Sequence, residues 1–157
     1  YKWNTAGLPY GSNYKVKVYA KDSAGNVGED ASNETFTITS PTPPTITIIK
    51  PRNSLYIMDR EIIPLPPYSS SQARPVIIGK ITIEATASGA AGIAKVEFYI
   101  DGLLKFIDTT EPYSWTWNEF VIGMHEIKVV AYDSVGQKAE DIISVFIVNS
   151  KSSPLFF

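Results

Sequence analysis

The sequence contains no cysteine among its 157 residues. Disulfide frameworks, zinc–thiolate sites and thiol nucleophiles are therefore excluded. It also lacks an apolar run of about eighteen residues, so no transmembrane helix is expected. Basic and acidic residues nearly balance, at 14 against 16. Because phosphate binding needs clustered Lys and Arg, this balance argues against a nucleic-acid partner.

Helical periodicity is almost absent as well. Apolar and polar residues alternate in short runs separated by Gly, Pro, Asn and Asp, which is typical of β-strands. Strands are predicted over residues 14–21, 35–39, 45–49, 54–58, 80–87, 94–100, 103–109, 113–117, 125–132 and 141–148. Asp101-Gly102 predicts a two-residue hairpin turn, since both residue types favour positive φ. Short strands at a spacing of about 8–12 residues predict an all-β sandwich.

The sequence contains an internal repeat. The stretch "YKVKVYAKDSAGN" (14–26) shares Lys, Val, Ala, Asp-Ser and Gly with "HEIKVVAYDSVGQ" (125–137) at the same places. Residues 1–40 correspond only to roughly 115–149 of the second copy. Between the copies, "TSPTPP" (39–44) removes backbone donors and favours an extended chain, so we interpret it as an interdomain linker.

Several of these stretches carry a resemblance to a known family. "GLPYGSNYKVKVYAKDSAGN" resembles the sixth strand and following turn of immunoglobulin-like and fibronectin-type modules of prokaryotic secreted and surface proteins. "GIAKVEFYIDG", "EPYSW" and "GMHEIKVVAYDSVGQKAED" resemble the bacterial Ig-like repeat. The resemblance implies one complete Ig-like β-sandwich over 41–149 and a C-terminal tail at 150–157. It also implies that 1–40 is the C-terminal part of an Ig-like domain.

The opening forty residues are too few for a sandwich. Two or three strands bury too little apolar surface to offset the cost of ordering the backbone. Val16, Val18, Phe36 and Ile38 therefore need a facing sheet. The first residue is Tyr1 and no signal peptide is recognisable, so we expect a fragment of a longer polypeptide. The missing strands would come from an upstream segment or from another chain.

Three residues that could serve in catalysis or metal binding also have structural interpretations. His125 is the only histidine, and it falls at the place of Tyr14, where Ig-like modules carry a corner tyrosine that bonds back to backbone. We expect a structural corner at Tyr14 and His125 rather than catalysis. Asp22 and Asp133 are weak calcium candidates. Capping of the following turn by each carboxylate is the preferred interpretation.

Aromatic residues and one sequon suggest contacts with sugars. Trp3, Trp115 and Trp117, with Tyr113 nearby, could form a stacking platform. Period two places Trp115 and Trp117 on one face, which favours a core role instead. Asn33 begins the glycosylation sequon Asn33-Glu34-Thr35.

The stretch from Asp59 to Pro75 lacks clear periodicity, and we expect a long loop there. Such loops in compact domains are often functional. Full exposure of the apolar side chains of Ile62, Ile63 and Leu65 to water would be unfavourable, so these three are candidate contact residues. They would pack on their own domain, or else contact a neighbouring domain or another subunit.

The expected function is that of a non-catalytic structural and adhesion module, acting as a spacer and protein–protein assembly unit. The expected location is extracellular or at the cell surface. No cofactor is expected. The expected partners are other Ig-like domains of the same precursor or neighbouring subunits, with a glycan as a further candidate. Two alternatives are the accessory region of a secreted hydrolase, and a carbohydrate-binding module that uses Tyr99, Tyr132 or the Trp cluster.

Overall fold

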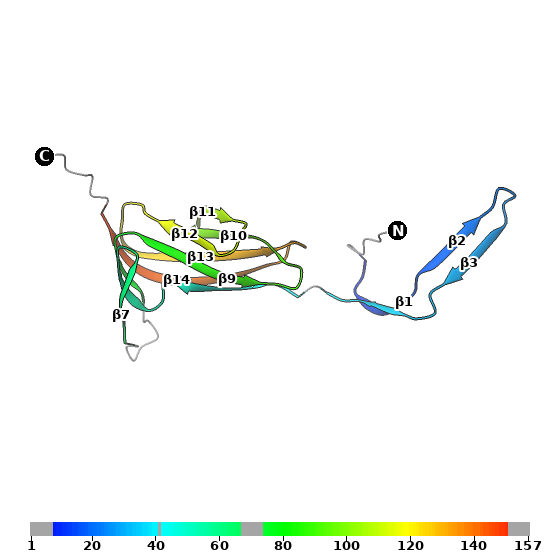
Figure 1. Ribbon diagram of the computed structural model, residues 1–157, viewed down its shortest axis with the longest axis horizontal. Coiled ribbons are helices and arrows are strands. Elements are labelled where there is room, and N and C mark those ends of the chain that lie inside the picture. The colour runs from blue at the N-terminus through cyan, green and yellow to red at the C-terminus, as the bar shows by residue number, and fades with distance from the viewer. Residues whose placement is uncertain (1–7, 41, 67–73, 151–157) are drawn as a thin grey trace. The chain divides into compact units, whose positions relative to one another are not determined.

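The computed structural model describes residues 8–40, 42–66 and 74–150. They divide into two compact units, unit 1 (Tyr1–Pro41) and unit 2 (Thr42–Phe157). The regular structure in the described residues is β-strand throughout (Figure 1), which confirms the all-β prediction. No helix in these ranges is long and apolar enough to cross a membrane.

Unit 2 is a sandwich of two sheets. The smaller sheet has three antiparallel strands in the order β12–β9–β5, with bounds Tyr113–Trp117, Ile81–Ser88 and Thr45–Lys50. The larger sheet has seven strands in the order β11–β10–β13–β14–β8–β6–β7. These span Leu103–Asp108, Ile93–Ile100, Val121–Asp133, Lys138–Asn149, Val76–Ile78, Ser54–Ile57 and Arg60–Pro64. Figure 1 shows β13 and β14 as long neighbouring strands behind β9.

The core of unit 2 follows the period-two pattern of the sequence. Ile81 and Ile83 on β9 are fully buried, and so are Val96 and Phe98 on β10. Alternate residues of a strand point to opposite faces of its sheet, so one regular pattern fills the space between the two sheets. The predicted turn at Asp101-Gly102 is confirmed, since their φ values are 49° and 77°.

The predicted loop from Asp59 to Pro75 is wrong for its first part. Arg60–Pro64 forms β7, which pairs with β6 through a turn at Met58 and Asp59, both at positive φ. Asp59 holds this hairpin in place because its Oδ1 accepts from the Thr82 N–H at 2.7 Å. A bulge at Ile62 of β7, which lies between the pairs Leu55–Ile63 and Tyr56–Glu61, breaks the alternation that would have marked the strand. Residues 67–73 lie outside the described residues.

Unit 1 consists of two strand pairs. β1 (Gly11–Tyr14) pairs with β4 (Phe36–Ile38), and β2 (Lys17–Lys21) pairs with β3 (Val27–Ala31). The predicted strand over 14–21 is therefore split, because a bulge in β1 with Asn13 at φ 69° bends the chain. The predicted connection between 21 and 35 contains β3, whose sequence "VGEDA" has too little alternation to be recognised. In Figure 1 these strands form one narrow ribbon.

Candidate functional site

The hairpin of unit 1 has the same register as the last hairpin of unit 2. Val18 pairs with Asp30 in unit 1, and Val129 pairs with Asp141 in unit 2. The neighbouring pairs agree at a constant spacing along the chain: Lys17 with Ala31 and Lys128 with Ile142, then Ala20 with Gly28 and Ala131 with Ala139. Each residue of β2 and β3 therefore has one counterpart in β13 and β14.

The turns of the two hairpins are also alike. Asp22 Oδ1 accepts from the backbone N–H groups of Ala24 and Asn26 at 2.9 and 2.8 Å. Asp133 Oδ1 accepts from the corresponding N–H groups two and four residues on, at 3.1 and 2.7 Å. The side-chain hydrogen bond from Asn26, helped by the backbone N–H groups, holds the pKa of Asp22 below its ordinary value.

Both aspartates thus use a carboxylate oxygen within their own turn. Across residues 8–40, 42–66 and 74–150, no three His, Asp or Glu side chains gather as a metal site would require. Calcium binding at Asp22 or Asp133 stays a prediction.

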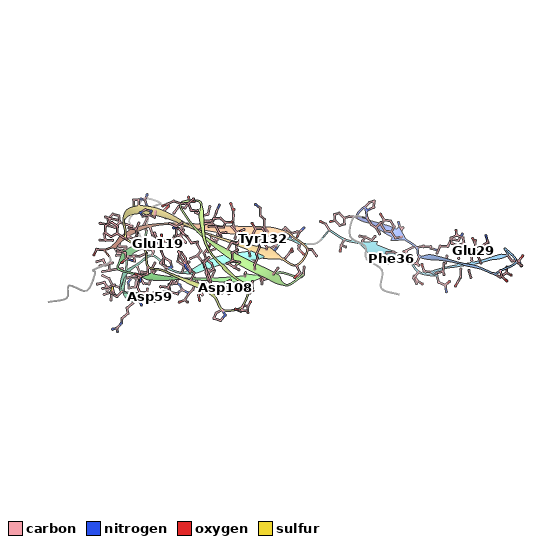
Figure 2. All side chains as sticks on the ribbon, turned by 90° about the horizontal axis from the view of Figure 1, so that it is seen from above. Glu29, Phe36, Asp59, Asp108, Glu119 and Tyr132 are labelled. Carbon is pink, nitrogen blue, oxygen red and sulfur yellow. The ribbon has the colours of Figure 1, made fainter. Side chains whose placement is uncertain are left out.

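The two hairpins differ sharply in burial. Ile127 and Val129 are fully buried in the core of unit 2. Their counterparts in unit 1, Val16 and Val18, are 42% and 62% exposed. The same register and the same residue types therefore form a core face in unit 2 and a solvent-exposed face in unit 1. Figure 2 shows the side chains of unit 1 projecting from both sides of its ribbon.

Asp30, on the exposed face of unit 1, corresponds to Asp141 of unit 2. In unit 2, Asp141 Oδ2 accepts from the backbone N–H of Ile48 on β5 at 2.8 Å, while Oδ1 accepts from Ile142 N–H. In unit 1, Asp30 Oδ1 accepts from Ala31 N–H at 2.9 Å. No described residue donates to Asp30 Oδ2, the counterpart of the Asp141 oxygen that accepts from Ile48.

A shallow groove lies beside Asp30 on this face of unit 1. It is lined by Val16, Val18, Asp30, Ala31, Ser32 and Asn33, which we call the open groove. In unit 2 the counterparts of its apolar and acidic residues lie under β5, whose Ile46 belongs to the buried core. The candidate glycosylation residue Asn33 is exposed at this groove, and its modification stays a prediction.

The two predicted corner residues make different bonds. The Tyr14 hydroxyl donates to the Pro9 carbonyl at 2.9 Å, five residues upstream. His125 does not bond to nearby backbone: its Nδ1 lies 2.6 Å from Asp101 Oδ2, and its ring meets Trp117 edge-on at 5.6 Å. The difference arises because the β10–β11 turn lies beside His125 and supplies a carboxylate.

The sequence did not predict the polar cluster on the outer face of the larger sheet. Glu97 is buried although period two placed it towards solvent. It accepts from Lys95 Nζ at 2.6 Å and from the Tyr99 hydroxyl at 2.5 Å. Burial alone would raise the pKa of Glu97, but these two donors hold it below its ordinary value. The bond to Glu97 raises the pKa of Tyr99 to about 12.

The aromatic candidates for sugar stacking are largely covered. Lys128 Nζ lies 4.9 Å above the ring of Tyr99, and Lys95 Nζ lies 4.5 Å above that of Tyr132, labelled in Figure 2. Trp117 is fully buried, and half-buried Trp115 packs near Phe98. Trp3 lies outside the described residues.

The candidate contact residues of the β6–β7 hairpin lie at one edge of the larger sheet. Ile62 and Ile63 on β7 are exposed, and Leu65 just beyond it is half-buried. Ile63 pairs with Leu55 and so shares its face. Their role in contacts stays a prediction.

Comparison with known proteins agrees with the fold. Residues 69–129 match the family model described as a bacterial Ig domain. Fibronectin(III)-like modules of Clostridium thermocellum CbhA superpose with a TM-score of 0.54 at 24% identity, covering 96% of this chain and 70% of that one. The resemblance to bacterial Ig-like modules is thereby confirmed, and unit 2 is an Ig-like, fibronectin-type sandwich.

Two further comparisons are weaker. A Ca²⁺-stabilised adhesin with which an Antarctic bacterium binds ice aligns over 88% of this chain and 32% of its own, at 18% identity and a TM-score of 0.35. This similarity is too low to carry an argument about binding or calcium. No curated protein matches the chain.

Proposed function

We propose that this chain is a non-catalytic structural and assembly module of an extracellular or cell-surface bacterial protein. In this proposal Ig-like sandwiches follow one another as spacers, and strands outside this sequence complete unit 1. The observation that carries the proposal is the exposed face of unit 1, whose counterpart in β13 and β14 is core.

Energetics favour completion of the open groove. An isolated two-stranded hairpin is marginally stable in water. Burying one Val side chain contributes about 1.5–3 kcal/mol, and Val16 and Val18 both lie largely in solvent. Because Val16 is 42% and Val18 62% exposed, a strand that covered both would add about 1.5–3 kcal/mol to the stability of unit 1.

The chemistry of the covering strand follows from β5. It would be extended, with apolar side chains at alternate positions like Ile46 and Ile48. It would also present a backbone N–H to Asp30 Oδ2, as Ile48 does to Asp141. An upstream segment of the same polypeptide and a separate chain could both supply this strand, and the experiment below distinguishes them.

The carbohydrate-binding alternative draws no support from the described contacts, since lysine ammonium groups lie over the rings of Tyr99 and Tyr132. The hydrolase alternative concerns what the rest of the polypeptide does. It assigns the same spacer role to this chain.

Amide hydrogen exchange tests the proposal. In the 157-residue chain we expect fast exchange in β2 and β3 and slow exchange in β13 and β14. In the longest natural polypeptide that carries this sequence, all four strands should exchange slowly. If β2 and β3 become slow only when a second polypeptide from the same source is added, the strand comes from another chain. Slow exchange of β2 and β3 in the 157-residue chain alone would contradict the proposal.

A further inference from the structure

The outer face of the larger sheet carries two apolar rows at one end of unit 2. In one row Met124 pairs with Phe146, Phe146 with Val76, Val76 with Leu55 and Leu55 with Ile63. In the other, Ile122 pairs with Val148, Val148 with Ile78, Ile78 with Ile57 and Ile57 with Arg60. We call these two rows, without Arg60, the outer apolar face.

These rows lie on the side of the sheet away from the core. Their neighbours along the strands, Tyr56, Ile77 and Ile147, are buried between the sheets, so the row residues point outwards. The six large side chains that remain exposed, each by 38–59%, are Ile57, Ile63, Ile78, Ile122, Met124 and Phe146.

The outer apolar face is large for a monomer. Six such side chains, each about half exposed, present on the order of 500 Å² of apolar surface, the upper end of what single chains carry. None of the row residues is charged, but three charged residues adjoin the face: Arg74 Nη1 donates to Met124 Sδ at 3.5 Å, Arg60 lies at one end, and Glu126 follows on β13. Apolar sheet faces pack against another sheet about 10 Å away.

We propose that the outer apolar face binds the same face of a second copy of this chain. Two such faces match in size and repel little, because their row residues are uncharged and the net charge of the chain is only −2. Together they would bury about 1,000 Å², the size at which specific interfaces begin. A self-complementary face generates a closed two-fold dimer. The predicted contact residue Ile63 belongs to this interface.

Analytical ultracentrifugation of the 157-residue chain over a wide concentration range tests the proposal. We expect a monomer–dimer equilibrium that Phe146→Lys weakens at least 100-fold. Ile142→Lys is the matched control: it lies on the same strand and face, is 47% exposed and is outside the two rows. Val18→Lys controls for association through unit 1. Both controls should leave the dimer intact.

A second measurement covers the case in which Phe146→Lys fails to fold. The absence of cysteine permits single-cysteine variants: Ile78→Cys, near the middle of the face, should form a disulfide-linked dimer under mild oxidation, and Ile142→Cys should not. A chain that stays monomeric at all concentrations overturns the proposal. So does a dimer that Ile142→Lys or Val18→Lys breaks as strongly as Phe146→Lys. A dimer that only Val18→Lys breaks would place the association in unit 1, which overturns the dimer proposal and leaves the completion of unit 1 standing.

Discussion

Val18 and Val129 occupy the same place in two hairpins, and replacing each by Thr gives a matched test of the incomplete unit. Thr keeps the β-branched shape and the strand propensity of Val, so the added hydroxyl is the main change. At fully buried Val129 the hydroxyl loses water, which costs about 1–3 kcal/mol of unfolding free energy. At exposed Val18 it stays hydrated, and we expect a change below about 0.5 kcal/mol.

Urea denaturation followed by tryptophan fluorescence measures the first effect, since Trp117 is buried in unit 2. With a slope of about 2 kcal/mol per molar urea, the midpoint for Val129→Thr should fall by about 0.5–1.5 M. Amide exchange in β2 and β3 measures the effect of Val18→Thr. If this variant speeds exchange there tenfold or more in the 157-residue chain, Val18 is already buried and the argument for a missing strand fails.

Three further predictions concern carboxylates. Asp141→Ala should lower the unfolding free energy of unit 2 by about 1–3 kcal/mol, because the Ile48 N–H loses its acceptor. Asp30→Ala is the matched control and should leave the urea midpoint of the 157-residue chain unchanged. Asp59→Ala should cost a similar amount and speed amide exchange in β6 and β7, because Asp59 joins their hairpin to Thr82 and Lys50; an unchanged exchange pattern would contradict that anchoring role. Glu97 and Asp101 have lowered pKa values in the folded state. The stability that they contribute should therefore be full above a pH of about 4–4.5 and be lost as the pH falls through their folded pKa values. In urea titrations at successive pH values, Glu97→Gln should reduce this loss of stability at acidic pH.

Most of the sandwich could be predicted because its strands alternate strictly. β12 was predicted at its observed bounds. Period two along the predicted strand 80–87 puts Ile81 and Ile83 on one face, and both are buried in the core. β3, β7 and β8 were not among the predicted strands. β3 contains Gly28, Glu29 and Asp30 and is held by the turn at Asp22 rather than by apolar alternation.

Features that depend on contacts between strands could not be predicted from one strand's pattern. The burial of Glu97 comes from Lys95 and Tyr99 closing over it. The correspondence between Asp30 and Asp141 could have been predicted from the sequence. Extending the repeat past the turn aligns Glu29-Asp30 with Glu140-Asp141, although only the structure shows that Asp141 holds β5.

In the two proposals, the open groove of unit 1 and the outer apolar face of unit 2 bind different kinds of partner. The groove combines apolar side chains with an acceptor, Asp30 Oδ2, placed as Asp141 Oδ2 is for a backbone N–H. Such a site recognises an extended strand, since backbone donors in a helix are already paired. The side chains of the outer apolar face offer no oxygen or nitrogen acceptor, so binding there would be stabilised mainly by the burial of apolar side chains. Adding sulfate should therefore strengthen the dimer of unit 2, because it favours apolar burial. Removal of the Asp30 carboxylate should weaken completion of unit 1 and leave the dimer unchanged.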